Sequence, residues 1–231
     1  MHERLIYWTS AILMLSMAGS ASAALVAQWN FDNDATDSVG NLNWTLEGGV
    51  SYSTDAKQGS HSLQVDGTDD HAYRAAVGML NSAFSAKMVM MWFKADGVNG
   101  TQVLYDEGGY TNGLSIRVND GALEAAVVNA NVIFTASTPF SSSDWTHVAA
   151  IFDSGSLLLY MNGTEQGMTA ATFTTVGSHT SAAGIGARRL DGAFGVGRHG
   201  RLFWRPYRRC QAVRQCFDRG RNSWDWRRAH L

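Results

Sequence analysis

The loop after residues 25–31 gathers side chains that could bind a metal ion. It reads Asp32-Asn33-Asp34-Ala35-Thr36-Asp37-Ser38-Val39-Gly40-Asn41, so carboxylate and amide oxygens are dense along it. Loops rich in oxygen suit Ca²⁺, which takes about six to eight oxygen ligands. Asp and Asn also cap their own backbone in turns, so a solvated turn without a metal is the alternative interpretation.

Paired carboxylates would indicate hydrolysis of glycosidic bonds, because retaining glycosidases hold two carboxyl groups about 5–5.5 Å apart. Two acids on one face of a strand would be two positions apart, and no Glu in the chain has an acid at that spacing. Asp106 and Glu107 are adjacent, and adjacent residues point to opposite faces of a strand. The motifs H-E-x-x-H, G-x-S-x-G and C-x-x-C are also missing. The sequence therefore predicts no catalytic site.

The elements that would position these residues are short strands. Apolar residues alternate along Leu25–Phe31, as in a half-buried strand. Further strands are predicted at Lys87–Ala95, Gln102–Tyr105, Leu114–Val118, Ala122–Val128, Val132–Thr135, Thr146–Phe152 and Ser156–Met161. Asn119-Asp120-Gly121 and Asn162-Gly163 supply the residues with positive φ that tight hairpin turns need. With only one short helical turn predicted (Val77–Phe84), the chain is expected to be all-β, a two-sheet antiparallel jelly-roll sandwich.

The first 23 residues have the pattern of a secretory signal peptide. A short charged start precedes an apolar run over Leu5–Ala18, which ends at the small residues Ala21-Ser22-Ala23. We predict cleavage near Ala23 and a secreted or extracytoplasmic protein. A membrane anchor is the alternative, but three polar residues interrupt a run already shorter than the roughly 20 residues of a membrane span.

Charge is distributed unevenly along the 231 residues, although the formal net charge is only −2. Residues 198–231 hold 10 of the 18 basic residues, all of them Arg, and both Cys. We divide the chain into the signal peptide (1–23), an acidic domain (24–195) and an Arg-rich tail (196–231). The acidic domain argues against a nucleic-acid partner, which calls for clustered basic charge. The tail is either a basic arm for nucleic acid or anionic lipid, or a segment in the wrong reading frame.

Short motifs follow one another in a recognisable order along residues 25–190. They are Val26–Asp32, Asp37–Asn41, Ser62–Asp70, Met90–Lys94, Trp145–Ala149, Leu159–Gly163 and Ile185–Arg188. Together they resemble the laminin G-like jelly-roll domains of the concanavalin A-like lectin/glucanase superfamily. The resemblance implies a sandwich that binds carbohydrate or a protein partner, often around one structural Ca²⁺. By position, Asp32, Asp37 and Asn41 are the candidate metal ligands.

The resemblance also implies a closing strand, which residues 198–231 do not contain as written. Codons read one base further on allow Leu202–Trp224 to encode a segment with Ile-Asp-Asp-Val and Ala-Leu, similar to that closing strand. We therefore predict a one-base frame error between about Leu190 and Val196. The tail is expected to be disordered from about Val196, and the first strand to lack its partner.

The sequence thus predicts an exported, non-catalytic binding domain, for glycans in the first place. Aromatic side chains at the surface would stack on sugar rings, and Trp44, Trp92, Tyr105 and Tyr110 are the candidates. A cell-surface adhesion or structural protein that binds proteins through the same sandwich is the alternative. A glycan-active hydrolase is the third interpretation, and the missing carboxylate pair disfavours it.

Overall fold

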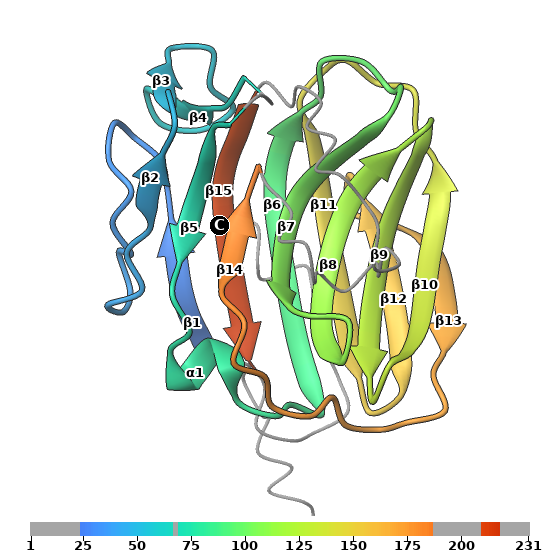
Figure 1. Cartoon of the computed structure of the whole chain (residues 1–231). Helices are drawn as coiled ribbons and strands as arrows, with labels where there is room; N and C mark the ends of the chain where they lie inside the picture. The colour runs from blue at the N-terminus through green and yellow to red at the C-terminus, as the bar shows by residue number, and fades with distance from the viewer. Residues whose placement is uncertain (1–23, 67–68, 187–208, 218–231) are drawn as a thin grey trace, which may run out of the picture.

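The structure is a computed structural model that describes residues 24–66 and 69–186, and Arg209–Phe217 through their backbone. In these residues, two antiparallel sheets face each other and one short helix, α1 (Gly78–Asn81), lies at one end (Figure 1). The expected all-β jelly-roll sandwich is confirmed. The predicted signal peptide lies outside the described residues.

The first sheet has eight strands. Seven are hydrogen-bonded in the order β13-β12-β11-β6-β15-β4-β3, and β1 pairs with β15. Their bounds are β1 (Ala24–Trp29), β3 (Ser51–Ser53), β4 (Ser62–Gln64), β6 (Ala86–Lys94), β11 (Thr146–Asp153), β12 (Ser156–Met161), β13 (Thr164–Ala170) and β15 (Arg209–Phe217).

The second sheet has seven strands, in the order β10-β9-β8-β7-β14-β5-β2. Their bounds are β2 (Thr45–Glu47), β5 (His71–Arg74), β7 (Thr101–Gly108), β8 (Asn112–Asn119), β9 (Ala122–Asn129), β10 (Val132–Pro139) and β14 (Ala183–Ile185).

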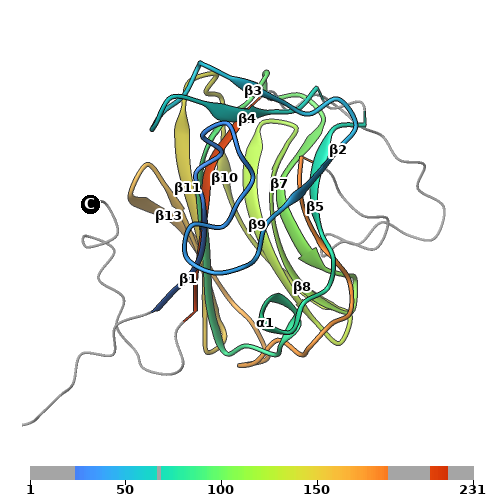
Figure 2. The same ribbon diagram turned by 90° about the vertical axis from the view of Figure 1, so that its left-hand side faces the viewer.

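The core lies between the two sheets, which Figure 2 shows as two curved layers. Alternate residues of each strand point inward, because side chains of a strand alternate between its faces. In β6, Val89, Met91 and Phe93 belong to this main core. Met88 and Met90 point the other way and pack with Ala149, Ile151, Leu158 and Tyr160 in a smaller cluster on the outer face of the eight-stranded sheet. Alternate residues of β6 therefore belong to the core and to the outer face of the eight-stranded sheet.

Both predicted hairpin turns are confirmed. Asp120 (φ 45°) and Gly121 (φ 82°) join β8 to β9, and Asn162 (φ 50°) and Gly163 (φ 80°) join β12 to β13. These left-handed backbone angles match the right-handed twist of the flanking strands, which is why Asn, Asp and Gly are favoured there. The predicted short helical turn over Val77–Phe84 is α1.

The tail requires a correction. We expected it to be disordered from about Val196 and the first strand to be unpaired, but Arg209–Phe217 forms β15, which lies between β1 and β6. The main chain makes the ladder, so a segment of nine residues without Pro or Gly can occupy the closing position even if its side chains differ from those expected. The remaining tail residues lie outside the described part of the chain.

The frame error remains a prediction, and restoring the frame is expected to raise the melting temperature by about 5 °C or more. The restored segment would place the expected side chains, in place of the Arg-rich ones, at a central strand that contacts both β1 and β6. Differential scanning calorimetry of the two chains measures the difference. An equal or lower melting temperature for the restored chain would contradict the prediction, as would codons that do not encode Asp-Asp-Val one base on.

Candidate functional site

Aromatic and charged side chains gather on the outer face of the eight-stranded sheet, at the end of β6. Trp92 and Lys94 follow Met88 and Met90 on that face of β6. On the neighbouring strand β11, His147 is paired with Trp92, and their rings are 5.2 Å apart in an edge-on arrangement. The loop between β3 and β4 adds two side chains. We call this set the Trp92 cluster: Asp55, Lys57, Trp92, Lys94, Trp145 and His147.

Asp55 holds the cluster together. One of its carboxylate oxygens accepts a hydrogen bond from the Trp145 indole N–H at 2.9 Å. The other accepts one from the Lys94 ammonium, also at 2.9 Å. These contacts fasten the β3–β4 loop to the ends of β6 and β11, and Asp55 thereby orients the Trp145 indole.

Lys57 lies on the same loop, and its side chain contacts the indole ring of Trp92. Its ammonium nitrogen is 4.8 Å from the centre of the Trp92 ring, within the range of a cation–π interaction. Lys57 is exposed, Trp92 and Trp145 are half-buried, and the Lys94 and Asp55 side chains are 32% and 35% exposed. The cluster thus presents two indole rings beside charged hydrogen-bonding groups at the surface. Such a combination suits a ligand with apolar faces and many polar groups.

The four aromatic residues predicted from the sequence have different surroundings. Trp44 is buried and packs on Trp29 with ring centres 5.2 Å apart, and Tyr105 is fully buried. Both are core residues and are excluded as surface platforms. Trp92 belongs to the cluster, and Tyr110 is 60% exposed after β7. Trp145 was not among these candidates, although it belongs to the segment Trp145–Ala149 on which the family resemblance rests.

The predicted metal ligands Asp32 and Asp37 accept hydrogen bonds from different groups of the protein. Oδ1 of Asp37 accepts hydrogen bonds from the backbone N–H groups of Gln28 and Val39, and Oδ2 accepts one from Leu42. Asp32 accepts hydrogen bonds from Ser60 and His61 of the β3–β4 loop, and those from Ser60 lower the pKa of its carboxyl.

The contacts of Asp37 and of Asp32 Oδ1 are those of a capped loop, because N–H and O–H donors bond to these carboxylate oxygens. Asn41 is exposed, and its backbone carbonyl oxygen accepts a hydrogen bond from the Arg74 guanidinium at 3.3 Å. A solvated turn without a metal therefore accounts for these contacts. Calcium binding by the loop stays a prediction.

A second acidic cluster lies within Ser62–Asp70, a segment that the sequence analysis used only for the family resemblance. One carboxylate oxygen from each of Asp66, Asp69 and Asp70 lies within 4.8 Å of the others. Asp70 is buried, and its oxygens accept hydrogen bonds from the backbone N–H groups of Gly49 and Asp66. Asp70 thereby fastens the turn before β5 to the turn after β2.

Replacing Asp37 with Asn is expected to lower the free energy of unfolding by about 1–2 kcal/mol, equally in Ca²⁺ and in EDTA. The amide cannot accept the hydrogen bond of Leu42, and the loop loses one of its anchors. Urea denaturation under both conditions measures the change, with exposed Asp34→Asn as the control. A loss confined to the Ca²⁺ samples would instead support the metal site.

The same variant has a predicted pH dependence. Burial raises the pKa of Asp37, but the backbone hydrogen bonds of Gln28, Val39, Gly40 and Leu42 outweigh burial and lower the pKa overall. A lowered carboxyl pKa stabilises the fold above the unfolded value of about 3.9 and loses this effect as the pH falls through the folded value. The difference between wild type and Asp37→Asn should therefore shrink below about pH 4.

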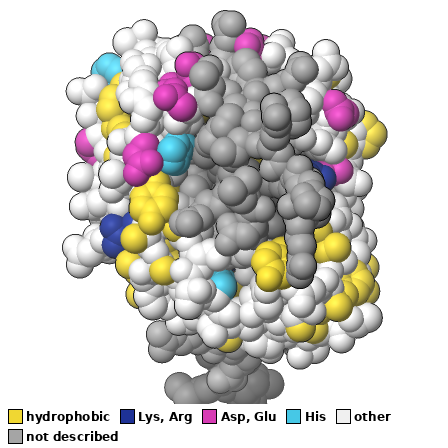
Figure 3. Space-filling model, in the orientation of Figure 1, with side chains coloured by type: hydrophobic (Ala, Val, Ile, Leu, Met, Phe, Trp, Pro, Cys, Tyr) yellow, Lys and Arg dark blue, Asp and Glu magenta, His cyan; other side chains and the backbone are white. Residues whose placement is uncertain are grey.

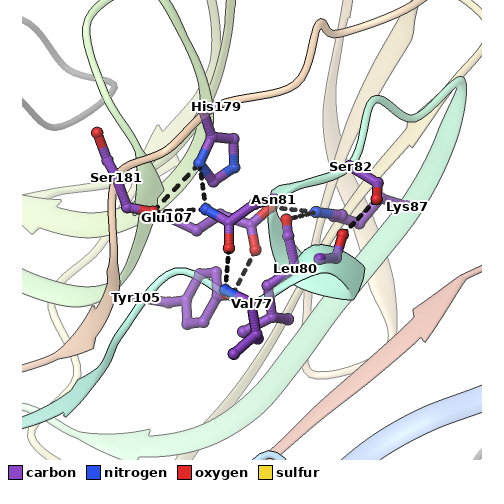
Figure 4. A network of polar contacts seen from close by, with 10 residues as sticks. Val77, Leu80, Asn81, Ser82, Lys87, Tyr105, Glu107, His179 and Ser181 are labelled. Carbon is purple, nitrogen blue, oxygen red and sulfur yellow. Dashed lines mark hydrogen bonds and ion pairs between the residues drawn. The ribbon is translucent and has the colours of Figure 1, made fainter.

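A buried polar network joins the two sheets inside the sandwich (Figure 4). Lys87 of β6 forms an ion pair with Glu107 of β7, and both side chains are fully buried. The Tyr105 hydroxyl donates to the other Glu107 oxygen at 2.6 Å, and Lys87 also donates to the carbonyl oxygen of Leu80 at 3.3 Å. Burial lowers the pKa of Lys87, although Glu107 opposes the shift.

Asn81 of α1 extends this polar region to the segment that precedes β14. Its amide nitrogen contacts His179 Nδ1 at 2.8 Å and donates to the carbonyl oxygen of Ser181 at 2.6 Å. Asp106 points to the opposite face of β7, where it accepts a hydrogen bond from Ser115, as the alternation along a strand predicts. Glu107 points inward instead, and its carboxylate, bonded to Lys87 and Tyr105, connects the two sheets.

The outer face of the seven-stranded sheet carries more acidic than basic side chains among the described residues. Figure 3 shows Asp and Glu side chains around the upper part of this face and only isolated Lys or Arg. Arg117 of β8 is paired with Glu124 of β9 at 2.5 Å, which neutralises one of these cations.

A family model described as "Concanavalin A-like lectin/glucanases superfamily", of the laminin G type, matches residues 66–198, more than half of the chain. The chain belongs to this superfamily. The laminin G-like resemblance of the sequence motifs is thereby confirmed. The matched region includes Trp92, Lys94, Trp145 and His147, and the β3–β4 loop precedes it. No curated protein sequence matches the chain.

Solved structures support the concanavalin A-like fold. Domain 4 of AbnA, a GH43 extracellular arabinanase from Geobacillus stearothermophilus, in complex with arabinotriose, has a TM-score of 0.65 and 20% identity, over 85% of this chain and 93% of that one. The binding domain of botulinum neurotoxin DC in complex with SialylT has a TM-score of 0.62 and 11% identity, over 85% of this chain and 48% of that one. A structure that concerns cell entry of botulinum neurotoxin type C through two ganglioside molecules has a TM-score of 0.65 and 12% identity, over 88% and 50%. Identities this low indicate the fold alone, and the chain spans about half the length of the neurotoxin chains.

Among the residues that the structure describes, no helix is long and apolar enough to cross a membrane.

Proposed function

We propose that this chain is an exported, non-catalytic domain that binds carbohydrate through the Trp92 cluster. The observation that carries the proposal is the pair of half-buried indoles, Trp92 and Trp145, beside Asp55 and two lysines at one end of β6 and β11. Sugar rings have apolar C–H faces and polar edges, so they can pack on an indole while their hydroxyl groups bond to neighbouring charged groups.

The relatives in fold support this assignment. Domain 4 of AbnA was solved with arabinotriose, and the neurotoxin binding domains were studied with sialylated glycan or gangliosides. These proteins interact with sugars and have the same fold as this chain, which supports the same use of this domain. Export is supported by the signal-like pattern of residues 1–23.

Absence of catalysis is also part of the proposal. Glu107, whose carboxylate is fully buried, is paired with Lys87 and accepts a hydrogen bond from Tyr105 inside the sandwich. A general acid or a nucleophile must reach its substrate within hydrogen-bond distance, and this position faces the opposite sheet.

A glycan array probed with the full chain tests the proposal, and size-exclusion chromatography of the same sample tests the alternative. We expect binding to at least one oligosaccharide, and loss of the signal in an Asp55→Ala variant that retains the wild-type circular dichroism spectrum. Asp34→Ala removes an exposed carboxylate that is not part of the Trp92 cluster and serves as the control. No glycan binding combined with self-association would contradict the proposal and favour an adhesion protein.

A further inference from the structure

Positive charge is scarce among the side chains that the structure describes. Five of them are Lys or Arg: Lys57, Arg74, Lys87, Lys94 and Arg117. Three of the five are occupied away from the Trp92 cluster. Lys87 is buried against Glu107, Arg117 is paired with Glu124, and Arg74 donates to the backbone carbonyl oxygens of Asn41 and Asn43.

The other two cations both lie in the Trp92 cluster. Lys94 contacts Asp55 at 2.9 Å, and Lys57 is exposed with its ammonium over the Trp92 ring. The described side chains of the cluster thus include two lysines and one aspartate, whereas the described residues outside it hold many more Asp and Glu than Lys and Arg. Among the described side chains, those outside the cluster would mostly repel an anionic ligand, whereas the two lysines of the cluster would attract it.

The position of Lys57 distinguishes between neutral and acidic sugars. A neutral sugar that stacks on the face of Trp92 must displace the ammonium and lose its cation–π interaction. A sugar that carries a carboxylate compensates for this loss, because the displaced ammonium forms a charge-assisted hydrogen bond with the carboxylate. The flexible four-carbon stem of Lys57 allows the short movement that this exchange requires.

We propose that the ligand of the Trp92 cluster is an acidic saccharide, with a ring face against the Trp92 indole and its carboxylate against the Lys57 ammonium. This inference rests on the proposed function and specifies the class of glycan. Because the ion pair is near the surface, binding should weaken as salt is added.

The test is an array that carries sialyl-lactose, oligogalacturonate and oligoglucuronate, each beside its carboxyl methyl ester, together with lactose and sulfated lactose. The methyl esters keep the sugar and remove the charge. The full chain is probed as wild type, Lys57→Gln, Lys57→Arg and Arg117→Gln, the last of which removes one positive charge from the other sheet. Sulfated lactose separates recognition of a carboxylate from attraction to any anion.

We expect at least one carboxylated probe to bind about fivefold or more tightly than its methyl ester. Lys57→Gln should remove this preference, whereas Lys57→Arg and Arg117→Gln should keep it. Equal binding of a carboxylated probe and its ester, or binding of sulfated lactose alone, would overturn the inference but leave carbohydrate binding intact. Failure of every acidic and neutral sugar to bind would contradict the proposed function itself.

Discussion

Replacing Lys87 with Met is expected to lower the free energy of unfolding by about 3–5 kcal/mol. The substitution leaves Glu107 as a buried carboxylate without its counter-ion, at a position where both side chains of the pair are fully buried. The Tyr105 hydrogen bond to Glu107 remains, but one neutral donor cannot replace an ammonium group in a low dielectric. Chemical denaturation followed by Trp fluorescence measures the effect.

Two further variants separate the ion pair from simple packing. Lys94→Met removes the ammonium from a half-exposed pair with Asp55, and we expect it to cost less than about 1 kcal/mol. The double variant Lys87→Met/Glu107→Leu removes both buried charges, so most of the stability lost in Lys87→Met should return. If Lys87→Met costs no more than Lys94→Met, the buried pair does not have the role described here.

Replacing either Trp92 or Trp145 with Ala is expected to weaken glycan binding by about 10- to 30-fold. Truncation of a central aromatic residue in a binding site costs roughly 1.4–2 kcal/mol, which corresponds to this range. The two variants should differ in stability, because they remove different contacts. Trp145→Ala removes the hydrogen bond to Asp55. Trp92→Ala removes the ring contact with His147 and the cation–π contact with Lys57. Isothermal titration with an oligosaccharide found on the array measures the loss of affinity.

Tyr110→Ala is the matched control for these variants. Tyr110 is the most exposed of the aromatic residues predicted from the sequence, but it lies after β7 in the other sheet. Its removal should leave affinity unchanged within about twofold. A loss at Tyr110 similar to that at Trp92 would move the binding site to the β7–β8 turn.

The local features of the fold could be predicted from the sequence. Alternating apolar residues predict β6 to β12, and Asp120-Gly121 and Asn162-Gly163 predict two hairpin turns, because these signals act over a few residues. Strand β13 was missed because Thr164–Ala170 is mostly polar and contains Gly167. It forms as the outermost strand of the sheet, hydrogen-bonded to β12, so burial of its side chains is small.

The site was harder to predict, because long-range pairing creates it. Asp55 and Trp145 are 90 residues apart, and Trp92 meets His147 only through the register of β6 with β11. Alternation indicates which residues share a face of a strand but not which face contacts the core, so Trp44 and Tyr105 were candidates although both are buried. The acidic loop had a strong compositional signal, yet Asp37 uses its oxygens to bind backbone N–H groups.

The most direct test of the account is a titration of the isotopically labelled chain with an oligosaccharide, followed through the indole N–H signals in two-dimensional NMR. Each Trp gives its own signal, and substitution assigns it. We predict that the signals of Trp92 and Trp145 shift with one common saturation curve, while those of the buried Trp29 and Trp44 stay in place. Saturable binding that leaves the Trp92 and Trp145 signals unchanged would contradict carbohydrate binding at the Trp92 cluster.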